Sequence, residues 1–312
     1  MHISNWVVGK VGGLVLNSTE AVKRLPYVLR QTNVNILVVS AFYGQTRLLL
    51  KVCDTLDSRY FLEDFIDYHK KMVEDLGLES SFNFLFLSHI RKFNRLYNKM
   101  MLKDGSIDEE SFRASVLAFG EDFSQTIVAE YLHQNYLNVE EGDSLAVVDA
   151  RKIVATESGK CCDASVDQFT SKIRIQENIR PVSGRLFIVQ GFIGSLATEP
   201  SRTTVLPLDG SDVTAALIAA CLSTIEKPVS LVYFKRGDPD SLYGFSNARK
   251  LMVYMKESGK TIVSPSIFDI KGLPSNFLIR NYDDLDQSLG VSAEPEMLKR
   301  IVKDTVYNPS DL

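Results

Sequence analysis

The stretch Asn5-Trp-Val-Val-Gly-Lys-Val-Gly-Gly13 predicts a short buried strand that ends in two glycines. Ser18 or Thr19 is typical of a helix N-cap, which predicts a helix to about Arg30. The next apolar run, Ile36-Leu-Val-Val-Ser40, is bounded by polar residues and indicates a strand that is buried on both faces of a parallel sheet. The start of the chain therefore predicts a strand, a helix and a second strand in succession.

Strands and helices alternate along the rest of the chain as well. A helical tract without proline is expected from about Gln45 to Leu137, because its apolar residues recur every three or four positions. Further strands are expected at 145–148, 185–189, 230–234 and 277–279, and further helices at 211–224, 246–258 and 294–305. This alternation predicts one α/β domain with a mostly parallel sheet and helices on both faces.

Composition restricts the classes of function. The chain has 312 residues, 45% of them hydrophobic, which is enough for one large α/β core. A net charge of −4 argues against nucleic acid or an anionic membrane as the main partner. The start of the chain lacks the pattern of a signal peptide and no segment approaches membrane-spanning length, so a cytoplasmic protein is expected. The four cysteines lack metal-binding spacing, and no metal-ligating residues are expected.

Lys10 and the glycines after it have the residue types that a phosphate site requires. Gly12 and Gly13 would let backbone amides approach a phosphate closely at the start of a helix. The lysine could offset the charge that builds on a transferred phosphoryl group. A tight turn beside a solvated lysine is an equally good interpretation of these residues alone.

Two further stretches contain acidic residues near expected helix starts. Asp209-Gly-Ser-Asp212 precedes a strong helix, so Ser211 and Asp212 are expected in its first turn, and either could be the N-cap. Glu121 follows Gly120 and is expected at the start of another helix. There it is either a favourable first-turn charge, which the spacing alone favours, or a ligand for a cationic group.

Taken in order, these stretches resemble the catalytic domain of aspartate kinases, in the amino-acid kinase family. The most specific match is Gln190-Gly-Phe-Ile-Gly-Ser195 followed by Arg202-Thr-Thr204, because it continues directly into Gly210-Ser-Asp-Val-Thr-Ala-Ala-Leu217. The other matching stretches are Lys10-Val-Gly-Gly13, Ser40-Ala-Phe-Tyr-Gly-Gln-Thr46, Gly120-Glu-Asp-Phe-Ser124, Asp149-Ala-Arg-Lys152, and Gly259-Lys260 with Pro265.

The resemblance implies a three-layer αβα sandwich that transfers the γ-phosphoryl group of ATP to an amino-acid carboxylate, with aspartate as the first candidate. It implies a single catalytic domain over 1–312, with an acceptor-binding lobe over about 1–205 and a nucleotide-binding lobe over about 206–290. No C-terminal regulatory domains are expected. ATP and Mg²⁺ would be the cofactors, and a homodimer is expected because related enzymes pair through their catalytic domains.

The resemblance also implies roles for individual residues. The catalytic residues would be Lys10 and Asp212. The acceptor would contact Ser40, Thr46, Arg47, Glu121 and Ser211, with Glu121 on its ammonium group. The nucleotide would contact Gly12, Gly13, Lys260 and Arg236.

Some positions depart from the family pattern. Leu208 stands where the family has an arginine that holds a substrate carboxylate, and Asp209 adds a negative charge beside it. We expect Arg47 to supply the missing carboxylate contact, and Arg236 is only a loose replacement for an arginine of the altered nucleotide loop. Three functions therefore stay open: an aspartate kinase, a kinase of the same fold with a different acceptor, and a non-catalytic protein that binds a nucleotide or metabolite.

Overall fold

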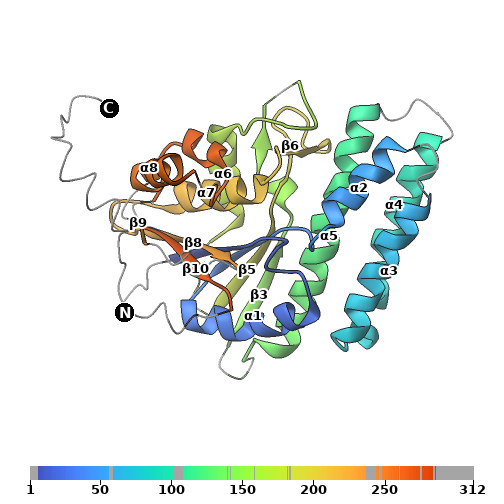
Figure 1. Ribbon diagram of the computed structural model, residues 1–312, viewed down its shortest axis with the longest axis horizontal. Coiled ribbons are helices and arrows are strands. Elements are labelled where there is room, and N and C mark those ends of the chain that lie inside the picture. The colour runs from blue at the N-terminus through green and yellow to red at the C-terminus, as the bar shows by residue number, and fades with distance from the viewer. Residues whose placement is uncertain are drawn as a thin grey trace.

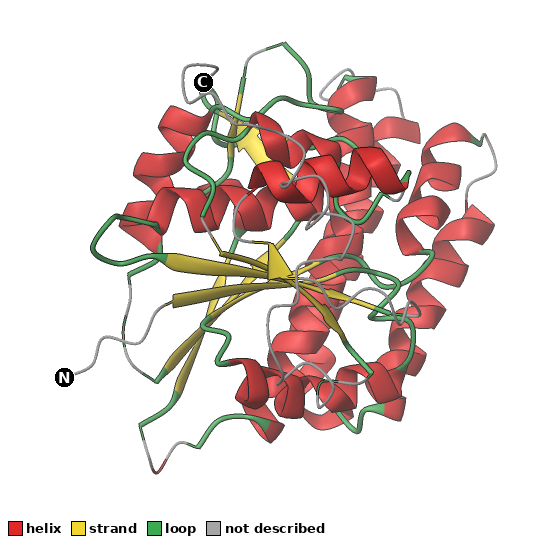
Figure 2. Cartoon of the chain, turned by 60° about the vertical axis from the view of Figure 1, so that its left-hand side comes forward, coloured by secondary structure: helices red, strands yellow, loops and turns green. Residues whose placement is uncertain are grey.

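The computed structural model describes residues 6–55, 59–101, 108–138, 140, 142–157, 159–180, 182, 184–236, 244–245, 248–259, 261–274, 276–283 and 285. Within these ranges a seven-stranded, mostly parallel sheet lies between two layers of helices (Figures 1 and 2). The expected α/β class and the three-layer αβα arrangement are confirmed.

The main sheet has the strand order β3-β5-β2-β1-β8-β10-β9. The parallel strands are β1 (Trp6–Val11), β2 (Ile36–Val39), β3 (Ser144–Val148), β5 (Arg185–Gln190), β8 (Val229–Lys235) and β10 (Asn276–Asn281). The short β9 (Gly244–Phe245) pairs antiparallel with β10. Strand β1 lies in the middle of the order, where Lys10 pairs with Val38 of β2 and with Tyr233 of β8.

The strand order reverses at β1. The chain continues from β1 to β2 on one side, whereas β8 joins the other side of β1 much later in the sequence. The parallel strands end at one common edge, and ligands of open α/β sheets bind at that edge where the order reverses. The carboxyl ends of β1, β2 and β8 are therefore the first place to look for a site.

Helices cover both faces of the main sheet. On one face α1 (Thr19–Thr32) contacts α5 (Glu109–Asn135), and on the other α6 (Gln168–Asn178) contacts α7 (Gly210–Leu222), with α8 (Ala248–Ser258) nearby (Figure 1). Helices α2 (Gln45–Asp54), α3 (Arg59–Asp75) and α4 (Glu79–Met101) pack with α5 at the side of the sheet (Figure 1). A smaller sheet contains β4 (Ala155–Thr156), β6 (Ile193–Leu196) and β7 (Thr203–Val205), and the 3₁₀ turns are η2 (Ala150–Lys152) and η3 (Pro265–Asp269).

The first helix and the second strand form as the sequence predicts. The Ser18 hydroxyl accepts a hydrogen bond from the Ala21 amide at 3.3 Å, which caps α1. The apolar residues of α1 include Leu25 and Leu29, and both are fully buried because they lie on the face that meets the core. All four residues of β2 are buried, as expected of a central parallel strand.

Other expectations are refined by the structure. In its described residues the tract from 45 to 137 contains four separate helices, and Gly77, with φ of 70°, lies in the turn after α3. The small sheet and α6 were not predicted. The helix expected at 294–305 lies outside the described residues. None of the helices in the described ranges is both long enough and apolar enough to cross a membrane.

Candidate functional site

Lys10 and Asp212 form a buried ion pair at the carboxyl edge of the main sheet. Lys10 is the penultimate residue of β1, and Asp212 lies in the first turn of α7. Lys10 Nζ lies 2.7 Å from Asp212 Oδ1, and the two side chains are only 8% and 3% exposed. Because a buried ion is costly unless it is paired, each of these groups compensates the charge of the other.

A second lysine and two hydrogen bonds complete the surroundings of Asp212. Lys235, the last residue of β8, has its Nζ 3.7 Å from Asp212 Oδ2, and the Ser264 amide donates to that oxygen at 3.0 Å. The Tyr233 hydroxyl donates to the backbone carbonyl of Asp212 at 3.1 Å. Burial by itself would raise the pKa of Asp212, but the nearby Lys10 and Lys235 ammonium groups lower the pKa overall. Two lysines around one ionised carboxylate leave a net positive charge, which suits an anionic ligand.

Two glycines form the turn after β1, and the turn lies close to the end of the Lys10 side chain and to the loop after β2. A Cβ on Gly12 would lie 2.9 Å from Lys10 Nζ, and a Cβ on Gly13 would lie 3.0 Å from the carbonyl oxygen of Ala41. The Val15 and Leu16 amides both donate to the Gly12 carbonyl at 3.0 Å, which closes the turn. The structure thus brings Gly12 and Gly13 beside the lysine, as the sequence predicts.

The start of α7 differs from the prediction in one detail. Ser211 and Asp212 lie in the first turn as expected, but the N-cap position belongs to Asp209, whose side chain makes no capping hydrogen bond. Asp209 has φ of 63°, a left-handed conformation that is uncommon outside glycine. A Cβ on Gly191 would lie 2.4 Å from Ser211 Cβ, so the loop after β5 packs directly against the start of α7.

Glu121 is in the interior of α5, and the prediction that it begins a helix is wrong. The helix begins at Glu109, after Asp108, whose side chain accepts from the backbone amide of Ser111 at 2.8 Å. Gly120 has a packing role instead, because a Cβ there would lie 2.9 Å from the Ala41 Cβ. The glycine lets α5 approach the loop that follows β2.

The carboxyl group of Glu121 is almost completely buried, with 2% exposure. Its Oε1 accepts a hydrogen bond from the Ala41 amide at 3.1 Å, whereas its Oε2 is buried without a hydrogen-bond partner among the described residues. Burial raises the pKa of Glu121 to about 8. A buried acid with an unused oxygen can bind a cationic group, which would satisfy the oxygen and favour the ionised form.

The other predicted acceptor residues lie on the loop after β2 and on α2. The Ser40 carbonyl accepts from the Ser124 hydroxyl at 2.8 Å, which ties this loop to the helix that carries Glu121. Thr46 lies in the first turn of α2 and is partly buried, whereas the neighbouring Arg47 is exposed. The structure therefore brings Ser40 and Glu121 together and leaves Arg47 at the surface of α2.

Of the predicted nucleotide contacts outside the glycine turn, only Arg236 lies in the described part of the chain. Arg236 follows β8, and its Nε lies 2.7 Å from Asp283 Oδ2. Its guanidinium group also contacts the Asn17 side chain, after the glycine turn. Lys260 lies outside the described residues, as do residues 237–243.

Sequence analysis did not find Lys235, Tyr233 or Ser264. A signal for Lys235 was present, because this lysine is the last residue of an apolar strand and Lys10 is the penultimate residue of another. Lys235 can be assigned to the site only when β1 and β8 are known to be neighbours, and a single sequence does not reveal which strands are neighbours. Among the described residues, no cluster of three or more His, Cys, Asp and Glu side chains could hold a metal ion.

Comparison with known proteins identifies the family. The model of the amino acid kinase family matches residues 5–229. The chain belongs to the amino acid kinase family. Within this amino acid kinase, Lys10, Glu121 and the Ser211–Asp212 turn all fall inside the matched region.

The chain is similar to aspartokinases, which confirms the expected resemblance. It is 23% identical over 305 residues to an aspartokinase of Chlamydia trachomatis, covering 95% of this chain and 59% of the relative. It is 26% identical over 218 residues to an aspartokinase of Chlamydia muridarum, covering 68% of this chain and 44% of the relative. This amino acid kinase thus spans about half the length of these two relatives.

Solved structures show the same fold. The structure of Escherichia coli aspartokinase III in complex with lysine and aspartate superposes with a TM-score of 0.74 at 22% identity, over 91% of this chain and 63% of that one. The structure of the same enzyme in complex with aspartate and ADP gives a TM-score of 0.70 at 20% identity, over 90% and 63% of the two chains. These likenesses establish the fold of this amino acid kinase.

Proposed function

We propose that this amino acid kinase transfers the γ-phosphoryl group of ATP to a carboxylate of an amino acid, and that L-aspartate is the first candidate acceptor. The observation that carries the proposal is the buried Lys10–Asp212 ion pair, with Lys235 beside it, at the edge where the strand order reverses. The similarity to aspartokinases supports the choice of aspartate.

The two lysines would stabilise the charge that moves during phosphoryl transfer. As an acceptor carboxylate oxygen bonds to the γ-phosphorus, the bond to the β–γ bridging oxygen breaks and negative charge gathers on the leaving ADP. Lys10 and Lys235 are held near one another by Asp212, and ammonium groups held in advance stabilise such charge without reorganisation. Asp212 would orient the lysines, since a carboxylate nucleophile needs no base to activate it.

Mg²⁺ would neutralise phosphate oxygens of the bound ATP. Asp212 is an acidic side chain at the proposed centre, and its two oxygens are already engaged by Lys10 and by the Ser264 amide. We therefore expect the phosphate oxygens to supply most of the Mg²⁺ ligands. The glycine turn, Arg236 and Lys260 remain the proposed nucleotide contacts.

Glu121 would bind the ammonium group of the acceptor. Its buried Oε2 lacks a partner among the described residues, and an ammonium group would satisfy it. The amide of Ala41 donates to Glu121, and the carbonyl of Ala41 lies against Gly13. Ala41 would thus connect the acceptor site with the phosphate site, and this connection would help to hold the two reactants in the relative orientation that the reaction needs. Ser40, Thr46 and Ser211 would complete the acceptor site.

A kinase with a different acceptor is the second candidate. Leu208 stands where the aspartate kinases have a carboxylate-binding arginine, and its side chain is 70% exposed just before α7. Beside it, Asp209 would repel a second carboxylate and attract a cationic group. An acceptor with one carboxylate, or with an additional cation, would suit this pair better than aspartate.

The remaining expectations are part of the same proposal. We propose one catalytic domain, with the acceptor site in a lobe over about 1–205 and the nucleotide site in a lobe over about 206–290. We also propose a homodimer that acts in the cytoplasm in amino-acid biosynthesis.

An ADP-release assay with ATP, Mg²⁺ and a panel of amino acids tests the proposal. Turnover with aspartate would support the first candidate, turnover only with another acid the second, and tight ATP binding without turnover a non-catalytic protein. Lys10→Met should lower kcat by about 10²- to 10³-fold if the chemistry is as proposed. Lys23→Met is the matched control, because Lys23 forms a surface ion pair with Glu20 at 3.5 Å, away from the site.

A further inference from the structure

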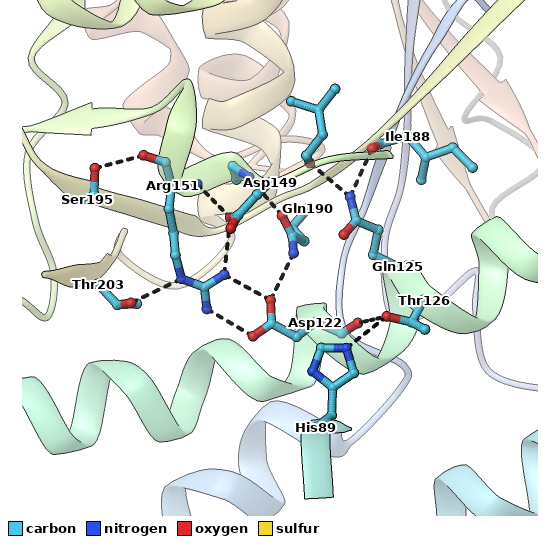
Figure 3. Close-up of polar contacts among 12 residues, drawn as sticks. His89, Asp122, Gln125, Thr126, Asp149, Arg151, Ile188, Gln190, Ser195 and Thr203 are labelled. Carbon is cyan, nitrogen blue, oxygen red and sulfur yellow. Dashed lines mark hydrogen bonds and ion pairs between the residues drawn. The ribbon is translucent and has the colours of Figure 1, made fainter. Parts of the chain in front are cut away.

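A groove of about 560 Å³ lies between α4, α5 and the loop after β3. Its size is that of a small-molecule site. The polar side chains that line it include Asp122, Asp149, Arg151, Gln190 and Thr203. Figure 3 shows that these side chains bond to one another. They therefore join separate parts of the protein to one another.

Arg151, in η2, is the centre of the network. Its two terminal nitrogens donate to the two oxygens of Asp122 at 3.0 and 2.9 Å, the two-pronged contact that makes arginine–carboxylate pairs strong. One of these nitrogens also donates to Asp149 at 3.2 Å, and Nε donates to the Thr203 hydroxyl at 3.0 Å (Figure 3). Arg151 thus links α5 to the loop after β3 and to β7.

Two glutamines extend the same linkage to the ends of the sheet strands. Gln190, the last residue of β5, donates to Asp122 at 2.8 Å and accepts from the Ala150 amide at 2.7 Å. Gln125, one helical turn after Glu121, donates to the carbonyls of Val148 in β3 and Ile188 in β5 at 2.9 and 2.8 Å (Figure 3). Helix α5 is therefore fixed to the sheet by buried polar contacts, which have strict geometry, as well as by apolar packing.

The contacts of Asp122 bear directly on Glu121, the preceding residue of the helix. Successive residues of an α-helix face directions about 100° apart. Asp122 can therefore hold Arg151 on one side while Glu121 reaches Ala41 on another. A rotation of α5 about its axis would break both contacts together. Without Arg151, the Asp122 carboxylate, whose side chain is 11% exposed, would be an incompletely paired charge that drives such a movement.

We propose that Arg151 is a positioning residue for the acceptor site: by holding both oxygens of Asp122, it fixes the rotation of α5 and thereby directs Glu121 to the loop after β2. The acceptor part of this inference rests on the proposed function. The positioning of Glu121 does not, and can be measured without any substrate.

The amide of Ala41 is the reporter, because it donates to Glu121 and Arg151 does not contact it. The protein is labelled with ¹⁵N-alanine, and Glu121→Gln identifies the direction in which the Ala41 resonance moves when its acceptor changes. Arg151→Met should move the Ala41 resonance and increase the hydrogen exchange of its amide. It should also raise KM for the acceptor about tenfold, while KM for ATP changes less than twofold.

Arg113→Met is the matched control, since Arg113 also pairs α5 with a neighbouring helix, through Asp54 of α2. It should leave the Ala41 resonance in place. Arg151→Lys keeps the charge without the two-pronged contact and should give an intermediate shift; it carries the test if Arg151→Met does not fold. An unmoved Ala41 resonance in the Arg151 variants, or an equal shift in Arg113→Met, overturns the inference. A shifted resonance in a protein that phosphorylates no amino acid supports the positioning and counts against the proposed function.

Discussion

Asp212 is the counter-ion of Lys10, with 2.7 Å between the charged atoms, although β1 and α7 lie far apart in the sequence. The same carboxylate lies 3.7 Å from Lys235, so one acidic side chain compensates one buried and one partly buried cation. Substitution of Asp212 and substitution of one lysine should therefore lower the free energy of unfolding by different amounts.

Asp212→Asn should lower the free energy of unfolding by about 3–5 kcal/mol, because it leaves two lysines without a counter-charge. Lys10→Met should cost less, because Asp212 keeps Lys235 and the Ser264 amide as partners. Urea denaturation at pH 7 measures both values. Equal losses would contradict the shared-carboxylate arrangement.

Gly12 and Gly191, two glycines that lie at the site, should respond differently to alanine. Gly12→Ala places a methyl group 2.9 Å from Lys10 Nζ, the flexible end of a side chain, which can move away. We expect a change in unfolding free energy within about 0.5 kcal/mol but at least a tenfold loss of kcat. Gly191→Ala places a methyl group 2.4 Å from Ser211 Cβ and 2.8 Å from Ser211 Cα, so backbone must move and stability should fall clearly. Thermal unfolding and ADP release separate the two outcomes.

Binding of an amino-acid acceptor should be tighter at higher pH. The pKa of Glu121, raised by burial to about 8, means that the free protein carries a proton on this carboxyl group at neutral pH. An ammonium ligand favours the ionised form, so binding releases the proton. The association constant should therefore rise with pH, by up to about tenfold per unit, and level off above pH 8. Calorimetric titrations from pH 6 to 9 measure the association constant, and Glu121→Gln should abolish its dependence on pH. An association constant that does not change with pH in the unmodified protein would count against Glu121 as the ammonium ligand.

The double change Leu208→Arg with Asp209→Gly should raise the affinity for aspartate about tenfold or more, by adding a charge-assisted contact and removing a repulsive charge. Glycine also suits the left-handed backbone at position 209, where φ is 63°, so the variant should fold at least as well. Steady-state kinetics with aspartate test this. Lack of any response would show that more than the acceptor pocket differs from the aspartate kinases.

Arg47→Ala examines the compensation expected from the sequence. Arg47 is exposed on α2 in the structure, next to the partly buried Thr46. If Arg47 reaches the acceptor carboxylate, the alanine variant should raise KM for aspartate about tenfold. An unchanged KM would remove Arg47 from the acceptor site.

The sequence predicts most of the main sheet because its strands are locally distinctive. Continuous apolar runs identify β2, β5 and β8, and the Ser18 cap identifies α1. The strands of the small sheet are too short to show any periodicity, and this explains why they were missed. Which strands pair with each other cannot be predicted from such local patterns, because the register that brings Lys10 opposite Tyr233 depends on contacts between distant segments.

Glu121 illustrates where local patterns mislead. Every residue of α5 from Val116 to Gln125 is buried, so the polar residues there do not mark a solvent-facing side. Gly120 followed by an acid has the composition of a helix start, but both residues are in the helix interior. There Gly120 allows α5 to approach Ala41 closely, and Glu121 accepts a hydrogen bond from the Ala41 amide. The residue types of the candidate site could be predicted; the buried network that fixes Glu121 could not, because its members come from α5, η2, β5 and β7.

The central position of β1 also has a consequence for how the chain acquires its structure. During synthesis, β1 can pair with β2 early, but its other edge stays open until the residues of β8, 229–235, have left the ribosome. Such long-range pairing makes folding slow and exposes an unpaired strand to other nascent chains. Arrival of β8 also brings Lys235 to the Lys10–Asp212 pair, so the proposed site is assembled only after this distant strand has joined β1.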